Sequence, residues 1–159
     1  MTTATLVPVH QRLDVDALVP GFSRAMSALD DAAVAEADRT GLDPVLRELV
    51  RLRASQLNGC AYCVDMHSRA ARASGGGQRV DAVAVWRESG LFTATERAAL
   101  DLAEEVTLVA TTHVREEVVV AAVAALGEEG AAALLALLVT INAWNAIGVT
   151  ARCWAVPVR

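Results

Sequence analysis

Hydrophobic residues in this chain recur at intervals of three and four positions, the spacing that places side chains on one face of a helix. Val45, Leu49 and Leu52 form one such stripe. No segment alternates apolar and polar residues between hairpin turns, as a half-buried strand would. Even the strand-prone run at 118–120 lies inside an alanine-rich helical pattern. We therefore predict an all-α fold.

Residues typical of helix ends divide the chain into about six helices. Asp43-Pro44 is typical of a helix start, and Asn58-Gly59 of a helix end. After a weakly amphipathic stretch over 22–29, we expect helices at about 44–57, 60–74, 79–88, 93–108, 113–126 and 129–148. The whole chain, 1–159, is expected to form one domain, with a motif region at 44–73 and a mobile segment of about 12 residues at the N-terminus.

Composition narrows the possible function classes. The apolar fraction of 54% exceeds the usual range of roughly 45–50%, as expected for a compact helical protein with a buried subunit interface or for an alanine-rich proteome. The net charge of −5, without a basic run, argues against nucleic-acid binding. All 14 basic residues are arginine, and the lack of lysine excludes Schiff-base chemistry and a Walker-type phosphate loop.

No segment predicts export or membrane insertion. The first 12 residues lack an apolar run of signal-peptide length. The most apolar run, Ala131 to Ile141, has 11 residues, includes Thr140 and is too short to span a bilayer. We therefore expect a soluble cytoplasmic protein. A Cys-x-x-Cys pair in that compartment is typical of a catalytic or metal-binding site rather than a disulfide scaffold.

Two cysteines and a histidine carry the candidate chemistry. Cys60, Cys63 and His67 fall within about 60° of a helical wheel, so they share one face. The break before Cys60 places both cysteines in the first turn, where free N–H groups and the helix dipole stabilise a thiolate. His67, one turn on, can hydrogen-bond Cys63 or take its proton. The opposite face is polar and predicted to be solvated: Asp65, Ser68, Arg69 and Arg72.

Glu48 on the preceding helix borders the apolar stripe and could face an interior partner. His67 is the candidate, because a carboxylate fixes the tautomer of an imidazole and raises its basicity. Arg53 and Gln56 fall inside the apolar arc and are expected to serve buried hydrogen bonds or a subunit contact.

The sequence leaves alternative interpretations of these residues open. Cys60, Cys63 and His67, with Glu48 as fourth ligand, could form a tetrahedral zinc site, and the group could also be an inert helix face. A sensing module without turnover is a further alternative, in which a disulfide or metal switches the oligomeric state.

Several further residues are expected to have structural rather than catalytic roles. Cys153, His10 and His113 are expected to be incidental, structural or solvated. The tryptophans Trp86 and Trp144 are expected to anchor the core or a subunit interface, and Trp144 could also line a pocket. The asparagines in the last helix, Asn142 and Asn145, need buried partners.

The segment Leu46–His67 (LRELVRLRASQLNGCAYCVDMH) resembles the alkylhydroperoxidase D-like (AhpD-like) core of the carboxymuconolactone decarboxylase superfamily, in its small single-domain form. Residues 86–100 and 141–145 are also similar to that family, so the resemblance covers roughly 20–150. It implies an all-helical AhpD-like bundle that forms homo-oligomers: dimers, trimers or hexamers. It implies no cofactor and no metal.

The resemblance also implies a thiol peroxidase reaction on a hydroperoxide. Cys63 would be the peroxidatic thiolate, Cys60 the resolving thiol, and Glu48 with His67 the proton relay. A lipoylated protein, a thioredoxin-like protein or a low-molecular-weight thiol would re-reduce the pair. Tyr62 stands where the best-known members carry a second histidine, so it is either an accessory group or a packed aromatic. The decarboxylase branch lacks the cysteine pair, which disfavours lactone decarboxylation.

Overall fold

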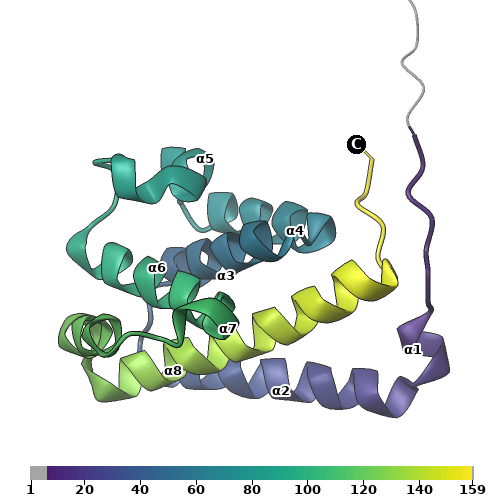
Figure 1. Ribbon diagram of the computed structural model, residues 1–159, viewed down its shortest axis with the longest axis horizontal. Coiled ribbons are helices and arrows are strands. Elements are labelled where there is room, and N and C mark those ends of the chain that lie inside the picture. The colour runs from purple at the N-terminus through teal and green to yellow at the C-terminus, as the bar shows by residue number, and fades with distance from the viewer. Residues whose placement is uncertain (1–6, 159) are drawn as a thin grey trace, which may run out of the picture.

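The computed structural model describes residues 7–158, and in this range the chain is all-α, as predicted. It contains eight α-helices and one 3-10 helix, η1 (Figure 1). Their bounds are α1 Val15–Leu18, α2 Pro20–Arg39, α3 Pro44–Asn58, α4 Ala61–Ala73, α5 Gln78–Ala82, η1 Val83–Glu88, α6 Ala94–Thr107, α7 Val109–Thr112 and α8 Glu116–Ala151.

The number of helices differs from the predicted six for local reasons. The helix expected at 79–88 divides into α5 and the 3-10 helix η1, and η1 itself contains a kink at Val85, whose φ is −124°. The helices α1 and α7 have only four residues each, too few to show a periodic pattern. The break predicted at Gly127 is present as a kink within α8, where φ is +75°, a conformation that favours glycine.

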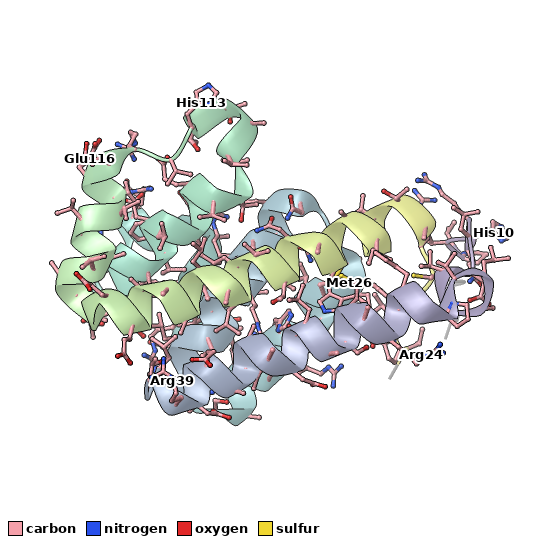
Figure 2. The ribbon with its side chains drawn as sticks, turned by 90° about the horizontal axis from the view of Figure 1, so that it is seen from below. His10, Arg24, Met26, Arg39, His113 and Glu116 are labelled. Atoms are coloured by element: carbon pink, nitrogen blue, oxygen red, sulfur yellow. A yellow bond between two sulfur atoms is a disulfide. The ribbon has the colours of Figure 1, made fainter. Side chains whose placement is uncertain are left out.

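The second part of α8 forms the centre of the bundle. The helix α8 packs against α2, α3 and α6, with a smaller contact to α4, and α3 packs in turn against α4 and α6. Figures 1 and 2 both show α8 and α2 side by side. Burying a leucine side chain contributes about 1.5–3 kcal/mol, so the fully buried leucines anchor these contacts. They are Leu49, Leu52, Leu100, Leu134, Leu137 and Leu138.

Among residues 7–158, α8 is the one helix whose length and composition would allow it to cross a membrane, with a mean hydropathy of 1.8. The apolar run predicted to be too short for a span, 131–141, thus lies inside a helix of 36 residues. The core helix of a helical bundle has the same composition, and α8 packs against α2, α3, α4 and α6 here.

The N-terminal segment is attached to the end of α8. The amides of Arg12 and Leu13 both donate to the carbonyl of Ala151, at 2.8 and 3.0 Å. Residues 1–6 of the segment expected to be mobile lie outside the described range, and residues 7–11 are exposed and without helix. Figure 2 shows His10 at this end of the molecule and His113 at the other, and both are exposed.

Candidate active site

The turn between α3 and α4 delivers two cysteines to the start of a helix. Asn58 ends α3, and Gly59 takes the left-handed conformation, with φ of +73°, that reverses the chain. Cys60 is then the N-cap of α4, and its Sγ accepts a hydrogen bond from the amide of Cys63 at 3.4 Å. Both cysteines therefore lie in the first turn, as predicted.

Cys60 and Cys63 are joined by a disulfide, with their Cα atoms 5.3 Å apart. Each is only 2% exposed, and they pack with Ala54 and Ile141. Spacing at i and i+3 in a first helical turn brings the two sulfurs together. In the reduced form, the unpaired amides and the helix dipole favour the thiolate there.

Glu48 and His67 meet across the interface of α3 and α4, as the helical wheel predicted. Nδ1 of His67 lies 2.7 Å from Oε2 of Glu48. Because a carboxylate accepts at Nδ1, the neutral imidazole carries its proton there and presents a lone pair at Nε2. His67 is 4% exposed, and Nε2 is buried without a hydrogen-bond partner. The ring therefore holds an available buried base.

Arg51 extends this pair to α2. Its Nη1 lies 3.6 Å from Oε1 of Glu48, and its Nη2 donates to Oδ1 of Asp30 at 3.4 Å. Burial is the largest influence on the pKa of Glu48 and raises it. The hydrogen bond and attraction from His67, with the charge of Arg51, outweigh burial and lower the pKa below its usual value. Glu48 is thus ionised at neutral pH and can stabilise a protonated His67.

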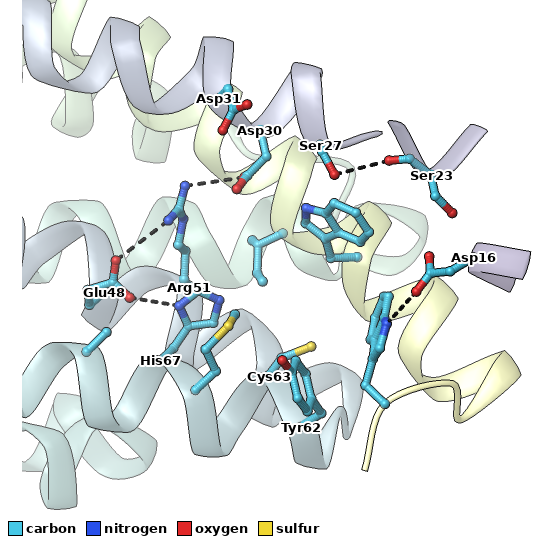
Figure 3. Close-up of a pocket in the computed structure, with 15 residues that line it drawn as sticks. Asp16, Ser23, Ser27, Asp30, Asp31, Glu48, Arg51, Tyr62, Cys63 and His67 are labelled. Carbon is cyan, nitrogen blue, oxygen red and sulfur yellow. Dashed lines mark hydrogen bonds and ion pairs between the residues drawn. The ribbon is translucent and has the colours of Figure 1, made fainter. Parts of the chain in front are cut away.

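A cavity of about 570 Å³ opens beside these groups (Figure 3). It brings together four of the residues proposed from sequence: Glu48, Tyr62, Cys63 and His67. Cys60, the disulfide partner of Cys63, is not among the lining residues. The other lining residues come from α1, α2, α3, α4, α8 and the segment after α8. They are Asp16, Ser23, Ser27, Asp30, Asp31, Arg51, Met66, Ala70, Ile141, Trp144 and Trp154.

Three aromatic side chains form one wall of this cavity. Trp154 packs on Tyr62 with ring centroids 5.7 Å apart and meets Trp144 edge-on at 5.6 Å. Its Nε1 donates to Oδ2 of Asp16 at 3.1 Å. Tyr62 is therefore a packed aromatic that also lines the pocket, and the pocket position considered for Trp144 is confirmed.

Gly148 allows α8 to approach this wall closely. A Cβ atom at this position would lie 3.0 Å from Sγ of Cys60 and 3.3 Å from the ring of Trp154. A larger residue at position 148 would therefore force α8 away from the Cys60–Cys63 disulfide and from the ring of Trp154.

Asparagines fix the end of α3 against α8. Nδ2 of Asn58 donates to Oδ1 of Asn142 at 2.7 Å and to Oδ1 of Asn145 at 3.0 Å. Nδ2 of Asn145 donates to Oγ of Ser55 at 3.1 Å. The buried partners expected for Asn142 and Asn145 are thus present, and they hold the turn that carries the cysteines.

The remaining candidates lie outside the pocket. Arg53, expected to serve a buried hydrogen bond or a subunit contact, makes a partly buried hydrogen bond to Oε1 of Glu104 at 2.7 Å, whereas Oε1 of Gln56 is buried without a hydrogen-bond partner among the described residues. Cys153 is a free thiol, and burial raises its pKa. Within residues 7–158, no three His, Cys, Asp or Glu side chains are grouped to hold a metal ion.

Comparison with known families places these residues in a wider context. The model of the carboxymuconolactone decarboxylase family matches residues 20–105, which include both cysteines, Glu48 and His67. The uncharacterized protein YdfG of Bacillus subtilis is 35% identical over 112 residues, which cover 70% of this chain and 76% of that protein. The uncharacterized protein YnjA of Escherichia coli is 46% identical over 70 residues, which cover 43% of this chain and 38% of YnjA.

Two solved structures share the fold. ATU0492 from Agrobacterium tumefaciens, a protein of unknown function proposed to be the antioxidant defence protein AhpD, is 32% identical, with a TM-score of 0.85. The match covers 94% of this chain and all of that one. The debrominase Bmp8, in its apo form, is 21% identical with a TM-score of 0.72 and shows the fold alone; that match covers 84% of this chain and 70% of Bmp8.

Proposed function

Since the chain belongs to the carboxymuconolactone decarboxylase family and has an AhpD-like fold with a Cys-x-x-Cys pair, we propose that it is a thiol-dependent peroxidase. It is an oxidoreductase with peroxide as acceptor, and it reduces hydroperoxides through a cycle of the Cys60–Cys63 dithiol and disulfide. The likeness to ATU0492, itself proposed to be AhpD, supports this choice of reaction.

One observation carries the proposal: a buried base without a partner lies in the same pocket as Cys63. Nε2 of His67 has no hydrogen bond within the described residues, and Glu48 fixes the tautomer that exposes its lone pair. A structural histidine in a core normally has both nitrogens paired. An open Nε2 in a cavity is instead suited to take and return a proton.

The chemistry starts from the reduced pair. His67 takes the proton of the Cys63 thiol, and the thiolate attacks the terminal peroxide oxygen. The S–O bond forms, the O–O bond breaks, and the protonated His67 gives its proton to the leaving alkoxide. Cys63 is then a sulfenic acid, and the Cys60 thiol attacks it, which forms the disulfide and releases water. Spacing at i and i+3 allows this second step before further oxidation.

A reductant must return the pair to the dithiol. We propose a thiol reductant: a lipoylated protein or a thioredoxin-like protein, each with two thiols, or two molecules of a low-molecular-weight thiol. Its thiolate attacks Cys63 from the pocket, and a second thiol then releases the mixed disulfide. One molecule of carrier disulfide is formed for each hydroperoxide reduced, so the two-electron balance is complete.

The test is hydroperoxide consumption by the reduced protein, with thiols counted before and after. Consumption of one equivalent of hydrogen peroxide or of cumene hydroperoxide, with loss of the Cys60 and Cys63 thiols and survival of Cys153, would support the peroxidase. Unchanged peroxide with all thiols still titratable would contradict it.

A second candidate is a thiol–disulfide reductase or redox sensor without peroxide turnover. Tyr62 favours it, because this phenol stands where related peroxidases carry a relay histidine and is packed on Trp154. The two functions differ in their readout. A sensor would change its oligomeric state or partner binding between the oxidised and reduced forms, and size-exclusion chromatography of both forms would detect this.

We also propose a cytoplasmic homo-oligomer. Large apolar side chains that α8 leaves exposed support a subunit contact: Val119, Val120, Leu135, Val139 and Val149. The reducing cytoplasm would supply the thiols that the cycle needs. Light scattering coupled to size-exclusion chromatography distinguishes a monomer from a dimer, trimer or hexamer.

A further inference from the structure

The pocket has two chemically different walls, and their arrangement bears on the substrate. Resting on the peroxidase function proposed above, we propose that the pocket selects uncharged organic hydroperoxides and discriminates against those that carry a carboxylate or another negative charge. The selection arises from an apolar wall beside Cys63 and an acidic wall across from it on α2, formed by Asp30 and Asp31, with Asp16 of α1 at the edge of the apolar wall, bonded to Trp154 (Figure 3).

The apolar wall accounts for an organic substituent. Trp154 contacts both Tyr62 and Trp144, and Met66 and Ile141 also line the cavity. The cavity of about 570 Å³ is far larger than hydrogen peroxide requires. A substituent such as a phenyl or branched alkyl group would bury apolar surface here, which favours binding by roughly 25 cal/mol per Å².

The acidic wall accounts for the choice of charge. The four acidic residues Asp16, Asp30, Asp31 and Glu48 line the cavity. Of the described lining residues, Arg51 alone has a permanent positive charge, and Glu48 and Asp30 already pair with it. Arg24 lines only the neighbouring exposed groove. An anionic substrate would therefore meet several carboxylates and no unpaired cation.

The orientation of the substrate follows from His67. Its Nε2 is buried, unpartnered and in the lining. Once it has taken the Cys63 proton, it can donate to the alkyl-bearing oxygen of the hydroperoxide, whose terminal oxygen then faces the Cys63 thiolate. The substituent then extends between the aromatic wall and α2, where Figure 3 shows Asp30 and Asp31 with Ser27. A negative group on that substituent would be brought toward these carboxylates.

A matched pair of substrates tests this selection. The probes are para-carboxycumene hydroperoxide, an anion at neutral pH, and its uncharged methyl ester, with dithiothreitol as reductant. We expect kcat/KM for the ester to be at least tenfold higher at low ionic strength, and the ratio to fall as salt screens the carboxylates. Equal kcat/KM values, or a faster anion, would overturn the selection and leave the peroxidase intact. Consumption of neither probe would overturn the peroxidase itself, and the selection with it.

Charge removal at the acidic wall provides the second test. Asp31 is exposed on α2 and lines the cavity. We therefore expect Asp31→Asn to lower the ratio of kcat/KM for the ester to kcat/KM for the anion at least threefold. Glu88→Gln is the matched control, because it removes the same charge from an exposed site outside the cavity lining and should leave the ratio unchanged. If both variants keep the ratio of the unmodified protein, the acidic wall is not its source.

Discussion

Nδ1 of His67 and Oε2 of Glu48 lie 2.7 Å apart, and this contact joins the helix that carries the cysteines to the helix that precedes it. One hydrogen bond thus sets both the geometry and the protonation of the site. The carboxylate holds the ring so that Nε2 faces the pocket, and its charge stabilises the imidazolium that forms when Cys63 loses its proton.

Replacing the carboxylate tests this relationship. We expect Glu48→Gln to lower kcat/KM for cumene hydroperoxide by about 10- to 100-fold, because the ring loses the charged acceptor that orients it at Nδ1. Stopped-flow measurement of peroxide consumption gives the value. The exposed Glu36→Gln on α2 is a control that should retain full activity. A Glu48→Gln enzyme as fast as the unmodified protein would remove Glu48 from the relay.

Substitutions of the two cysteines are expected to affect peroxide consumption in different ways. Cys63→Ser should reduce peroxide consumption to background, since no thiolate remains in the pocket. Cys60→Ser should react once and then hold Cys63 as a sulfenic acid, because no thiol resolves it. Mass spectrometry after dimedone treatment identifies the trapped adduct. An adduct found on Cys60 in the Cys63→Ser protein would instead reverse the two roles.

Acid should destabilise the protein through Glu104. Burial is the largest influence on the pKa of Glu104 and raises it, but hydrogen bonds from Trp86, Arg53 and Arg87 outweigh it and lower the pKa. A lowered pKa stabilises the fold above the unfolded pKa of about 4.3, and this stability is lost as the pH falls through the folded value. The free energy of unfolding should therefore decline below about pH 4.3.

Urea unfolding at several pH values measures this decline. Glu104→Gln should cost about 1–3 kcal/mol at pH 7, because three donors lose a charged acceptor, and should flatten the acid limb. A variant with the same acid limb as the unmodified protein would show that Glu104 is not a source of the pH dependence.

The close contact at Gly148 predicts a packing effect. Gly148→Ala places a methyl group 3.0 Å from Sγ of Cys60 and should destabilise the fold by about 1–3 kcal/mol, partly offset by the better helix propensity of alanine. Gly90→Ala is the matched control, since a Cβ there meets no atom within 4 Å. Urea unfolding of both variants gives the comparison, and a stabilised Gly148→Ala protein would contradict the close packing.

The parts of the site that sequence predicts are those set by local rules. Asp43 and Gly59 delimit α3, and the period of the helix then places Glu48, Cys63 and His67 on facing surfaces. Arg51 was not identified, although its position three residues after Glu48 is a signal for an ion pair on one helix face.

The rest of the site depends on contacts between distant segments. Trp154 and Asp16 are separated by 138 residues, and no local pattern relates them. Asp30 reaches Arg51 only because α2 and α3 both pack against α8. The sequence therefore predicts the reacting groups and not the walls around them, and the walls are what would decide the substrate.

The aromatic wall should also make the intrinsic tryptophan fluorescence of this protein depend on the redox state of the cysteine pair. Two of its three tryptophans, Trp144 and Trp154, belong to the wall, and the third, Trp86, lies beneath the guanidinium of Arg87. Disulfides quench indole emission at short range. Trp154 and Cys60 both lie close to Gly148, since a Cβ atom there would be 3.3 Å from the ring of Trp154 and 3.0 Å from Sγ of Cys60. Intrinsic fluorescence should therefore brighten when the pair is reduced, so the redox state can be followed in real time without a label.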